Sequence, residues 1–334
     1  MMKLAIIGTG GIVREALTAI DYVPQIALTS IFARPHSQDK AERLAKDFSL
    51  PVNIYTDYAK LLREDDADFV YIGLVNSAHY EYAKQALLAG KNVIVEKPFT
   101  TNYAEAAELA ELAQRKNLFL FEAIVPLYTA CFDDIKTKLS RLGRIRLVQA
   151  NFSQYSRRYD SYLQGTVLPA FDPKCAGGAL YDINIYNLAF IVALFGLPRG
   201  VKYAANIGFN GIDTSGVVTL TYDDFTAVAA GAKDSNSPPH FIVQGEQHWL
   251  KLNETANDPR TYTTDIKGHK EVYRFADEPE HRMANEFRAF AQMYDAQNYE
   301  KANERLKITL DVMRVAEQAR KIAGIVFPAD EVAK

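Results

Sequence analysis

The residues Asn92–Phe99, with the sequence Asn-Val-Ile-Val-Glu-Lys-Pro-Phe, decide how the rest of the chain is interpreted. Their run of apolar, mostly β-branched residues without alternation is typical of a strand buried on both faces. Pro98 cannot donate to a sheet ladder and restricts Lys97 to an extended backbone, so the strand ends here. A Glu96–Lys97 pair at the carboxyl end of a central strand lies where open α/β sheets bind their ligands. The alternative is an ordinary surface ion pair at a strand end.

A glycine-rich turn follows the first predicted strand, Leu4–Ile7. The segment Gly8–Val13 reads Gly-Thr-Gly-Gly-Ile-Val and opens a predicted helix. In a dinucleotide-binding site the first glycine makes the tight turn, and the second lets the pyrophosphate approach the helix N-terminus. Val13 departs from this pattern, which usually has glycine or alanine there, and is expected to push the helix slightly off the strand. The alternative is a tight turn with only a structural role.

The end of the second predicted strand indicates which dinucleotide is preferred. No acidic residue occurs between Gln25 and Gln38, so the usual partner of the NAD ribose 2′-hydroxyl is missing. Arg34 and Ser37 lie in this interval, and an arginine and a hydroxyl suit a 2′-phosphate. We therefore predict NADP, with NAD as the other possibility and a solvated loop arginine as the structural alternative.

The spacing of the predicted elements divides the chain into two domains. Strands alternate with helices up to Glu122, which predicts a doubly wound parallel sheet over residues 1–122. Over residues 123–334 several strands follow one another without helices between them, which predicts an α+β domain with a mainly antiparallel sheet. One face of that sheet is expected to stay open and to form a homodimer or homotetramer interface. Arg157–Asp172 is predicted to be a loop whose tyrosines and arginines bind a polar substrate or pack the loop.

The segment Gly177–Asn187 turns from a glycine-rich loop into an apolar helix. Asp182 and Tyr186 are four residues apart, so they lie on one face of that helix. Polar residues on an otherwise buried helix need partners, and a ligand-binding cleft supplies them. The alternative is a capping aspartate and a tyrosine whose hydroxyl reaches water.

Together these motifs resemble the Gfo/Idh/MocA oxidoreductase family over nearly the whole chain. The resemblance is carried by Gly8–Val13, Glu96-Lys97-Pro98, Glu122-Ala123 and Gly177–Tyr186. It implies a Rossmann domain followed by an α+β domain, and hydride transfer between a nicotinamide and a sugar, a polyol or a related carbonyl compound. Many members have histidine at the position of Tyr186. The glucose–fructose oxidoreductase and dimeric dihydrodiol dehydrogenase branch has tyrosine there, as this chain does, and that branch favours NADP. The departures are Val13, Leu74-Val75 in place of Thr-Pro, and Asn184 in place of glycine.

The same resemblance implies a division of roles. Tyr186 and Lys97 handle the proton, because a nearby ammonium favours the phenolate form of a tyrosine. Asp182 binds a substrate hydroxyl or holds Lys97 in place. His79 is expected either to face the cofactor or to be structural. The predicted cofactor-binding residues are Gly8, Thr9, Gly10, Gly11, Ile12, Ala33, Arg34, Ser37, Leu74, Val75, Asn76, His79, Glu96, Lys97 and Glu122.

The composition of the chain argues against several classes of binding partner. A formal net charge of −3 at pH 7 argues against nucleic acid, which requires a basic surface. The apolar run Leu188–Leu197 is too short to span a membrane. Cys131 and Cys175 match no metal spacing or disulfide framework, and Met1 leads directly into a strand, so we expect a cytoplasmic protein without a metal. The alternatives to a sugar or polyol dehydrogenase are a catalytically inactive cofactor-binding sensor and an enzyme of dihydrodiol or dicarbonyl compounds.

Overall fold

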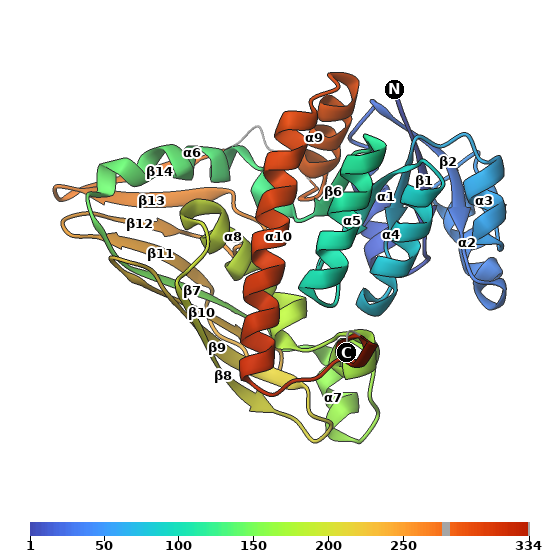
Figure 1. Ribbon diagram of the computed structural model, residues 1–334. Coiled ribbons are helices and arrows are strands. Elements are labelled where there is room, and N and C mark those ends of the chain that lie inside the picture. Colours follow the sequence, from blue (N-terminus) through green and yellow to red (C-terminus); the bar gives the residue numbers. More distant parts are fainter. Residues whose placement is uncertain (276–280, 333–334) are drawn as a thin grey trace. The chain divides into compact units, whose positions relative to one another are not determined.

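The computed structural model describes residues 1–275 and 281–332, and its chain forms two compact units (Figure 1). Unit 1 comprises Met1–Ala123 and Pro279–Lys307, and unit 2 comprises Ile124–Glu278 and Ile308–Lys334. The predicted domain limits placed Pro279–Lys307 with the second domain, whereas this segment groups with unit 1. The predicted second domain also includes residues 276–280 and 333–334, which lie outside the described residues.

Unit 1 contains a parallel sheet of six strands in the order β3-β2-β1-β4-β5-β6. Its strands are β1 (Met2–Ile7), β2 (Ile26–Phe32), β3 (Asn53–Tyr55), β4 (Phe69–Ile72), β5 (Asn92–Glu96) and β6 (Leu120–Ala123). Its helices are α1 (Gly11–Ile20), α2 (Gln38–Asp47), α3 (Tyr58–Glu64), α4 (His79–Leu88), α5 (Tyr103–Lys116) and α9 (Ala284–Asp295). This strand order reverses between β1 and β4, so the doubly wound fold that the sequence predicts is confirmed.

Helices cover both faces of the unit 1 sheet. Helices α4 and α5 pack together on one face, whereas α9 packs beside α1 and against β1 on the other. On that second face the Phe287 ring of α9 lies 5.6 Å from the Tyr71 ring, and the Phe290 ring lies 4.7 Å from the Phe121 ring. These aromatic contacts explain why a segment from the C-terminal part of the chain belongs to unit 1.

Unit 2 contains an eight-stranded sheet in the order β14-β13-β12-β11-β7-β10-β9-β8. All its neighbouring strands are antiparallel except β7 and β10, which are parallel. The strands are β7 (Ile145–Ser153), β8 (Gly200–Ile207), β9 (Asp213–Thr221), β10 (Thr226–Ala232), β11 (His240–Gly245), β12 (Trp249–Leu252), β13 (Thr261–Ile266) and β14 (His269–Arg274). The helices are α6 (Ala130–Lys138), α7 (Arg157–Leu163), α8 (Ile185–Phe195), α10 (Tyr299–Ile322), which begins in unit 1, and α11 (Ala329–Val332).

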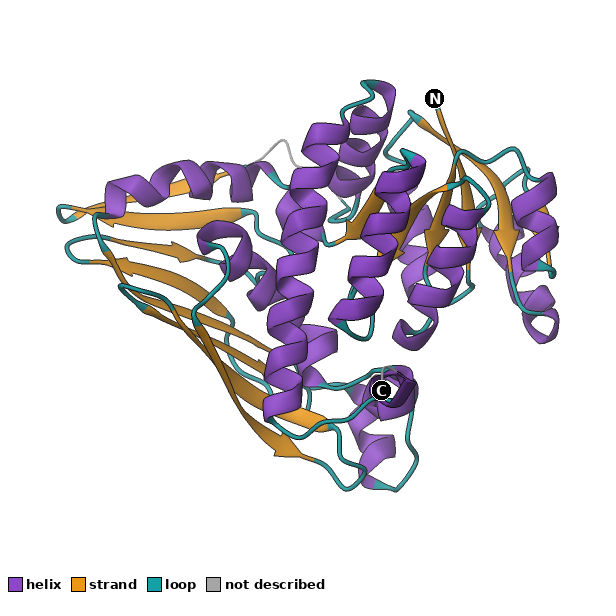
Figure 2. Cartoon of the chain, viewed as in Figure 1, coloured by secondary structure: helices purple, strands orange, loops and turns teal. Residues whose placement is uncertain are grey.

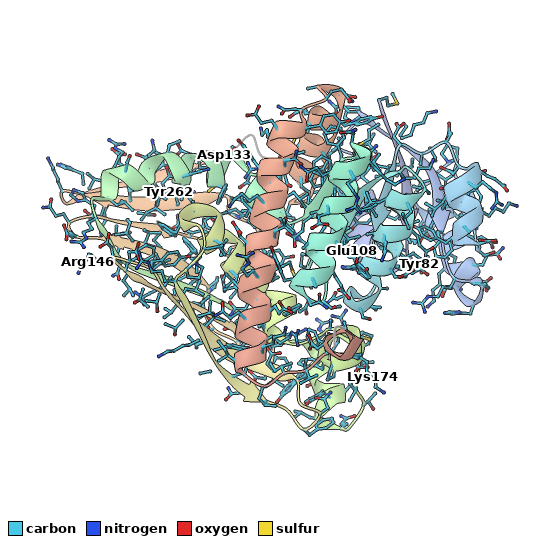
Figure 3. All side chains as sticks on the ribbon, viewed as in Figure 1. Tyr82, Glu108, Asp133, Arg146, Lys174 and Tyr262 are labelled. Atoms are coloured by element: carbon cyan, nitrogen blue, oxygen red, sulfur yellow. The ribbon has the colours of Figure 1, made fainter. Side chains whose placement is uncertain are left out.

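Helices α6 and α8 cover one face of the unit 2 sheet (Figure 2). The Phe190 ring of α8 contacts Phe132 of α6 and Phe241 of β11. Tyr262 of β13, labelled in Figure 3, is buried on the same face and donates its hydroxyl hydrogen to Asp134 of α6. One apolar helical stretch, Pro173–Phe195, has a mean hydropathy of 1.5, enough by length and composition to cross a membrane. Because 78% of its apolar window is buried inside the protein, it equally fits a core helix.

The structure corrects three local predictions. Residues Arg157–Leu163 form helix α7 rather than a loop, and the Ser156 hydroxyl caps it by accepting from the Arg158 N–H. Strand β13 was missed because its alternation is carried mainly by threonines, which are polar although they favour strands. The helix predicted after Gly178 begins with a π-helical turn, Leu180–Asn184, before α8.

Candidate active site

Gly8 forms the turn between β1 and α1, at the edge of the unit 1 sheet where the strand order reverses. Its φ of +120° lies in the region that favours glycine. A Cβ atom at this position would lie 2.5 Å from the Gly73 carbonyl oxygen, so a side chain does not fit. The loop after β1 and the loop after β4 therefore approach each other closely at the position where this class of sheet binds its ligand.

The N-terminus of α1 has the features of an anion-binding site. Gly10 is the N-cap residue, and no side chain caps the helix. Cβ atoms at Gly10 and Gly11 would have no neighbour within 4 Å, so a ligand has room to approach the backbone there. The first N–H groups of a helix lack intrahelical partners, and the helix dipole favours a negative group beside them. These residues fit a dinucleotide pyrophosphate.

Val13 lies against a glycine on the neighbouring strand end. Val13 is completely buried, and a Cβ atom at Gly73 would lie 2.8 Å from its Cγ2 atom. The missing side chain at Gly73 thus provides the room that the larger residue needs. The departure from the family pattern is accommodated by the opposite strand.

Arg34 and Ser37 lie in the loop after β2, next to the switch in strand order. The Arg34 side chain is exposed and that of Ser37 is half-buried. The Ser37 N–H donates to the Arg34 carbonyl over 2.7 Å, so a short helical turn orders the loop. Ala33 is buried beneath them. This arrangement leaves the guanidinium in solvent, where it can bind a phosphate group.

The loop after β4 is held by a buried histidine. Leu74, Val75 and Asn76 are half-buried, whereas the His79 ring at the start of α4 is completely buried. Its Nδ1 lies 2.9 Å from the Pro98 carbonyl and its Nε2 lies 3.2 Å from the Leu74 carbonyl. Burial lowers the pKa of His79, although the hydrogen bonds to the Pro98 and Leu74 carbonyls oppose that fall. These contacts favour the structural role for His79 over direct contact with a cofactor.

Lys97 follows β5 and is half-buried at the carboxyl edge of the sheet. Glu96 before it is buried and accepts a hydrogen bond from the Tyr71 hydroxyl over 2.8 Å and one from the Lys97 backbone N–H over 3.2 Å. Burial raises the pKa of Glu96, although the Tyr71 hydrogen bond and the Lys97 and Arg282 charges oppose that rise. Glu96 thus links the end of β5 to β4 through hydrogen bonds, and its carboxyl group is buried inside unit 1.

Two further glutamates lie close to Glu96. Glu122 of β6 is buried, and Glu286 of α9 is completely buried. Neither carboxyl oxygen of Glu286 has a hydrogen-bond partner among the described residues. Burial first, and then the charge of Glu96, raise the pKa of Glu286 well above its ordinary value. Glu286 therefore holds its proton to a higher pH than an ordinary glutamate does, and no sequence signal connected this residue with the strand end.

In unit 2 the Gly177-Gly178 turn lets a buried aspartate reach the helix that follows. Gly178 has a φ of +101°, and a Cβ atom there would lie 2.1 Å from Oδ1 of Asp213. Asp213 accepts hydrogen bonds from the Leu180 N–H over 2.6 Å and from the Tyr203 hydroxyl over 2.7 Å. The aspartate thus occupies the start of the π-helical turn, which has no cap of its own.

Asp182 and Tyr186 both come from this helical segment. The Asp182 side chain is 36% exposed and forms an ion pair with Lys233, whose own side chain is 3% exposed. The Tyr186 residue is 6% exposed, and its ring lies 6.1 Å from the Phe152 ring of β7. Lys233 immediately follows β10, and the sequence alone did not single it out. Polar residues on this helix thus have a charged partner inside unit 2.

Asn184, another of the departures from the family pattern, lies against a glycine as Val13 does. Its side-chain amide donates to the Ala229 carbonyl of β10 over 2.9 Å and accepts from Asn187 over 2.8 Å. A Cβ atom at Gly231 would lie 2.6 Å from the Asn184 Cβ atom. The asparagine therefore binds the strand backbone at a position where that strand carries no side chain.

The tyrosines expected either to bind substrate or to pack the loop do pack against one another. The rings of Tyr159 and Tyr162 stack at 5.8 Å, and both contact the buried Phe171 ring. The Tyr162 hydroxyl donates to Asn210 over 2.7 Å. These contacts favour the packing role.

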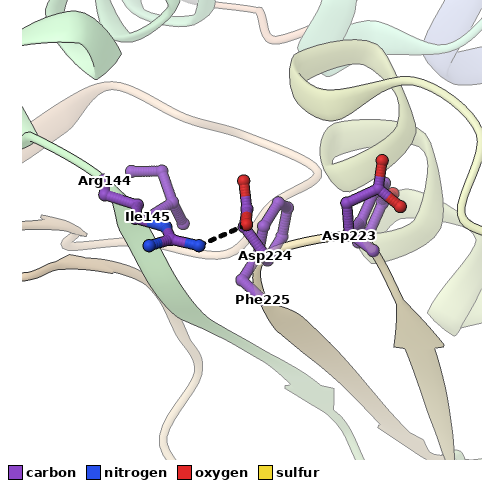
Figure 4. Close-up of a pocket in the computed structure, with 6 residues that line it drawn as sticks. Arg144, Ile145, Asp223, Asp224 and Phe225 are labelled. Atoms are coloured by element: carbon purple, nitrogen blue, oxygen red, sulfur yellow. Dashed lines mark hydrogen bonds and ion pairs between the residues drawn. The ribbon is translucent and has the colours of Figure 1, made fainter.

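Unit 1 thus brings the predicted cofactor residues to the carboxyl edge of its sheet. All fifteen lie in β5 or β6, or in the loops and helix starts that follow β1, β2, β4 and β5, among them Gly8, Ala33, Arg34, Leu74, Glu96, Lys97 and Glu122. Asp182 and Tyr186 belong to unit 2. A surface hollow of about 370 Å³ also lies in unit 2, at the turn between β9 and β10, and holds none of the predicted site residues (Figure 4). Its lining residues are Arg144, Ile145, Tyr222, Asp223, Asp224 and Phe225.

Comparison with known proteins supports one family for both parts of the chain. Residues 2–123 match a model described as an oxidoreductase family with an NAD-binding Rossmann fold. Residues 138–251 match the GFO/IDH/MocA C-terminal domain. The chain is 32% identical over 331 residues to scyllo-inositol 2-dehydrogenase (NADP(+)) of Bacillus subtilis, which covers 99% of this chain and 100% of the relative.

Two further relatives extend the comparison. Trans-1,2-dihydrobenzene-1,2-diol dehydrogenase of Oryctolagus cuniculus is 28% identical, covering 98% of this chain and all of the relative. A 3-ketoreductase from Actinomadura kijaniata, solved with NADP and TDP-benzene, has a TM-score of 0.83 at 24% identity and covers 96% of this chain and 97% of its own. The last likeness concerns the fold alone. The two family matches and the full-length relative show that the chain belongs to the Gfo/Idh/MocA family of oxidoreductases.

Proposed function

We propose that the protein is an NADP-dependent dehydrogenase or reductase of a polyol or sugar, in which Lys97 and Tyr186 handle the proton. The observation that carries this proposal is the full-length similarity to an NADP-dependent scyllo-inositol dehydrogenase. The cofactor, when bound, supplies or accepts the hydride at its nicotinamide ring, so the protein has to position the substrate and move a proton. In this proposal Tyr186 exchanges the proton of the substrate oxygen, Lys97 donates a hydrogen bond to that oxygen, and Asp182 accepts one from a neighbouring hydroxyl.

The cofactor proposal rests on residues of unit 1. The uncapped N-terminus of α1 would hold the pyrophosphate, and the exposed Arg34 would bind the ribose 2′-phosphate with Ser37 beside it. Arg34→Ala should therefore weaken NADP binding at least about tenfold, the scale of a lost charge-assisted contact, and leave NAD binding nearly unchanged. Fluorescence titration with NADPH and NADH measures both affinities. An equal loss for the two cofactors would reject the assignment of Arg34.

Two substitutions test the proton-handling residues. We expect Lys97→Met to lower turnover on the order of 10²-fold or more, the usual scale of general acid–base catalysis, while NADPH still binds. Tyr186→Phe should remove the corresponding limb of the pH–rate profile. Near-normal turnover in the first variant, or an unchanged profile in the second, would exclude that residue from the mechanism. The assay is NADP reduction with inositols and aldoses as substrates.

One other substrate class has specific support. Similarity to trans-dihydrodiol dehydrogenases favours an aromatic dihydrodiol or a dicarbonyl compound as the second candidate substrate. A cofactor-binding sensor without catalysis is the third possibility, and it predicts NADPH binding with no turnover on any of these compounds. The same substrate panel, extended to a trans-dihydrodiol and a dicarbonyl, separates the three.

We also propose that the chain forms a homodimer or homotetramer through the face of the unit 2 sheet opposite α6 and α8. The register places Leu147, Val228, Ile242 and Trp249 on this face, and all four are half-exposed. The same register also places Gln149, Gln244 and Lys251 there, so the face mixes apolar and polar residues, as interfaces between subunits do. Light scattering after size-exclusion chromatography should show an oligomer, and Leu147→Asp should dissociate it. Since Cys131 and Cys175 do not form a disulfide with each other, we propose a cytoplasmic location.

A further inference from the structure

Lys233 is a buried cation in unit 2 to which the proposed mechanism gives no role. Its side chain is 3% exposed and forms an ion pair with Asp182. Its Nζ atom lies 3.2 Å from the Ala170 carbonyl oxygen and 4.8 Å from the centroid of the Phe171 ring. An ammonium group is costly to bury unless it is paired and hydrogen-bonded. The ion pair with Asp182 and the hydrogen bond to the Ala170 carbonyl therefore compensate the burial of this cation.

Backbone hydrogen bonds and aromatic contacts hold the residues that surround Lys233. Its backbone N–H donates to Thr214 over 2.9 Å, and its carbonyl accepts from Ser156 over the same distance, so β10 fixes the base of the side chain. The Ala170 carbonyl also accepts from the Gly178 N–H over 3.0 Å. Tyr159 and Tyr162 pack against Phe171, which forms the wall beside the ammonium. The glycine turn and the aromatic cluster thus form one slot for a single cation.

Asp182 differs from its neighbours in exposure. The flanking residues Tyr181 and Ile183 are buried, whereas the Asp182 side chain is 36% exposed. One of its oxygens, Oδ2, contacts the Lys233 ammonium. A carboxylate held by a buried cation from inside the unit, and partly open to solvent, is set up to accept a hydrogen bond from outside.

We propose that Lys233 is a positioning residue for the reaction: it keeps Asp182 ionised and oriented to accept a hydrogen bond from a substrate hydroxyl. This inference rests on the proposed function. Of the two roles that the sequence left open for Asp182, it favours the binding of a substrate hydroxyl, since an ionised carboxylate held by Lys233 is a good hydrogen-bond acceptor. Loss of Lys233 should therefore weaken substrate binding more than it slows the chemical step.

The test compares Lys233→Met, Asp182→Asn and the double variant, with the exposed Lys136→Met of α6 as a matched control. For a polyol substrate we expect Lys233→Met to raise KM about tenfold or more, the scale of one charge-assisted hydrogen bond, with a smaller change in kcat. In the Asp182→Asn background the same substitution should change KM less than about twofold, because coupled residues are not additive. An equal cost in both backgrounds would overturn the proposal. A substrate analogue that lacks one hydroxyl then identifies the group that Asp182 binds.

A second readout does not depend on turnover. In protein labelled with ¹³C at the aspartate carboxyl carbons, the Asp182 signal is assigned by its loss in Asp182→Asn. In Lys233→Met its titration midpoint should move to higher pH by about one unit or more, because an adjacent cation favours the ionised form. An unmoved midpoint contradicts the inference. If Lys233→Met does not fold, Lys233→Gln keeps the shape and a neutral donor and is measured in the same way. A moved midpoint in a protein without turnover on any substrate would instead refute the proposed function and retain the ion pair.

Discussion

The two units surround some of their acidic side chains differently. In unit 1 Glu286 is completely buried near Glu96 without a hydrogen-bond partner among the described residues, and its pKa is raised well above the ordinary value. In unit 2 two acidic groups face buried cations: Asp182 pairs with Lys233, and Asp330 pairs with Arg320. A third, Asp213, is buried and held by hydrogen bonds instead.

Asp330 of unit 2 and Glu286 of unit 1 should therefore change the stability of the protein with pH in opposite directions. Burial alone would raise the pKa of Asp330, but the Arg320 and Phe327 hydrogen bonds outweigh it and lower the pKa below the ordinary value. Its contribution to stability is therefore present above the ordinary value of 3.8 and is lost as the pH falls. For Glu286 the pKa is raised, so its contribution is present below the ordinary value of 4.5 and is lost as the pH rises.

The largest effect should come from breaking the Arg320–Asp330 pair in unit 2. Arg320 is completely buried and donates to both Asp330 oxygens over 2.6 and 2.7 Å and to the Ile325 carbonyl over 2.8 Å. Removing one partner of such a pair costs about 3–5 kcal/mol, because the other charge is left without compensation. We expect Arg320→Met to lower the free energy of unfolding by that amount. Urea denaturation can be followed through Trp249 of β12, the single tryptophan of the chain.

The double variant Arg320→Met with Asp330→Leu is the control for this prediction. It removes both charges, so much of the lost stability should return. A loss below about 1 kcal/mol in the single variant, the scale of an exposed pair, would show that the ion pair does not stabilise unit 2.

Asp213→Ala should have the next largest effect on the free energy of unfolding. It tests whether hydrogen bonds compensate the burial of a carboxyl group as well as a cation does. The substitution leaves the Leu180 N–H and the Tyr203 hydroxyl without their acceptor. Each unsatisfied buried group costs about 1–3 kcal/mol, so we expect a loss of about 2–4 kcal/mol by urea denaturation. Because Leu180 begins the turn that carries Asp182, turnover should fall as well. Tyr203→Phe, which removes one donor and leaves Asp213 in place, should cost less than half as much.

The elements that follow local rules were predictable, and those that depend on distant partners were not. Both sheets and the family were predicted correctly, since buried strands, glycine turns and the Glu96-Lys97-Pro98 end are continuous in sequence. Helix α7 was also within reach, because Ser156 is a standard N-cap residue. The roles of the individual site residues stay predictions.

The partners of the site residues could not be predicted because they come from other strands. The glycine that leaves room for Val13 is Gly73, just after β4. The glycine that leaves room for Asn184 is Gly231 of β10. Lys233 is 51 residues from Asp182, and only the register of β10 brings the two together. Sequence patterns give the period of a strand but not which residue of another strand lies opposite. Val13 and Asn184 are both larger than the residues of the family pattern, and each faces a glycine of a neighbouring strand or strand end.

A smaller effect is expected from Tyr71→Phe in unit 1, which removes the hydroxyl that donates to Glu96 over 2.8 Å. The hydrogen bond opposes the rise that burial causes in the pKa of Glu96, so its loss should raise that pKa further. We expect unit 1 to lose about 1–2 kcal/mol at neutral pH, the usual value of a buried hydrogen bond to an acidic group. Hydrogen exchange of the β4 and β5 amides measures the effect in unit 1 alone. Tyr22→Phe, at an exposed tyrosine of unit 1, is the control and should leave these amides unchanged.

At acid pH, Glu286→Gln should change the stability of unit 1 least of all these substitutions. Its effect at higher pH is the most direct test of the contrast between the two units. The neutral glutamate and the amide are similar in shape, so the two proteins should differ least at the lowest pH. As the pH rises, the unfolded chain releases this proton at lower pH than the native state does, so wild type loses stability that the glutamine variant keeps. Exchange protection of β4 and β5 at pH 5, 7 and 9 should thus diverge in favour of the variant. Glu300→Gln, an exposed glutamate of α10, should show no such divergence. Parallel curves for Glu286→Gln and wild type would mean that Glu286 is ionised in the native state, and the contrast between the two units would then disappear.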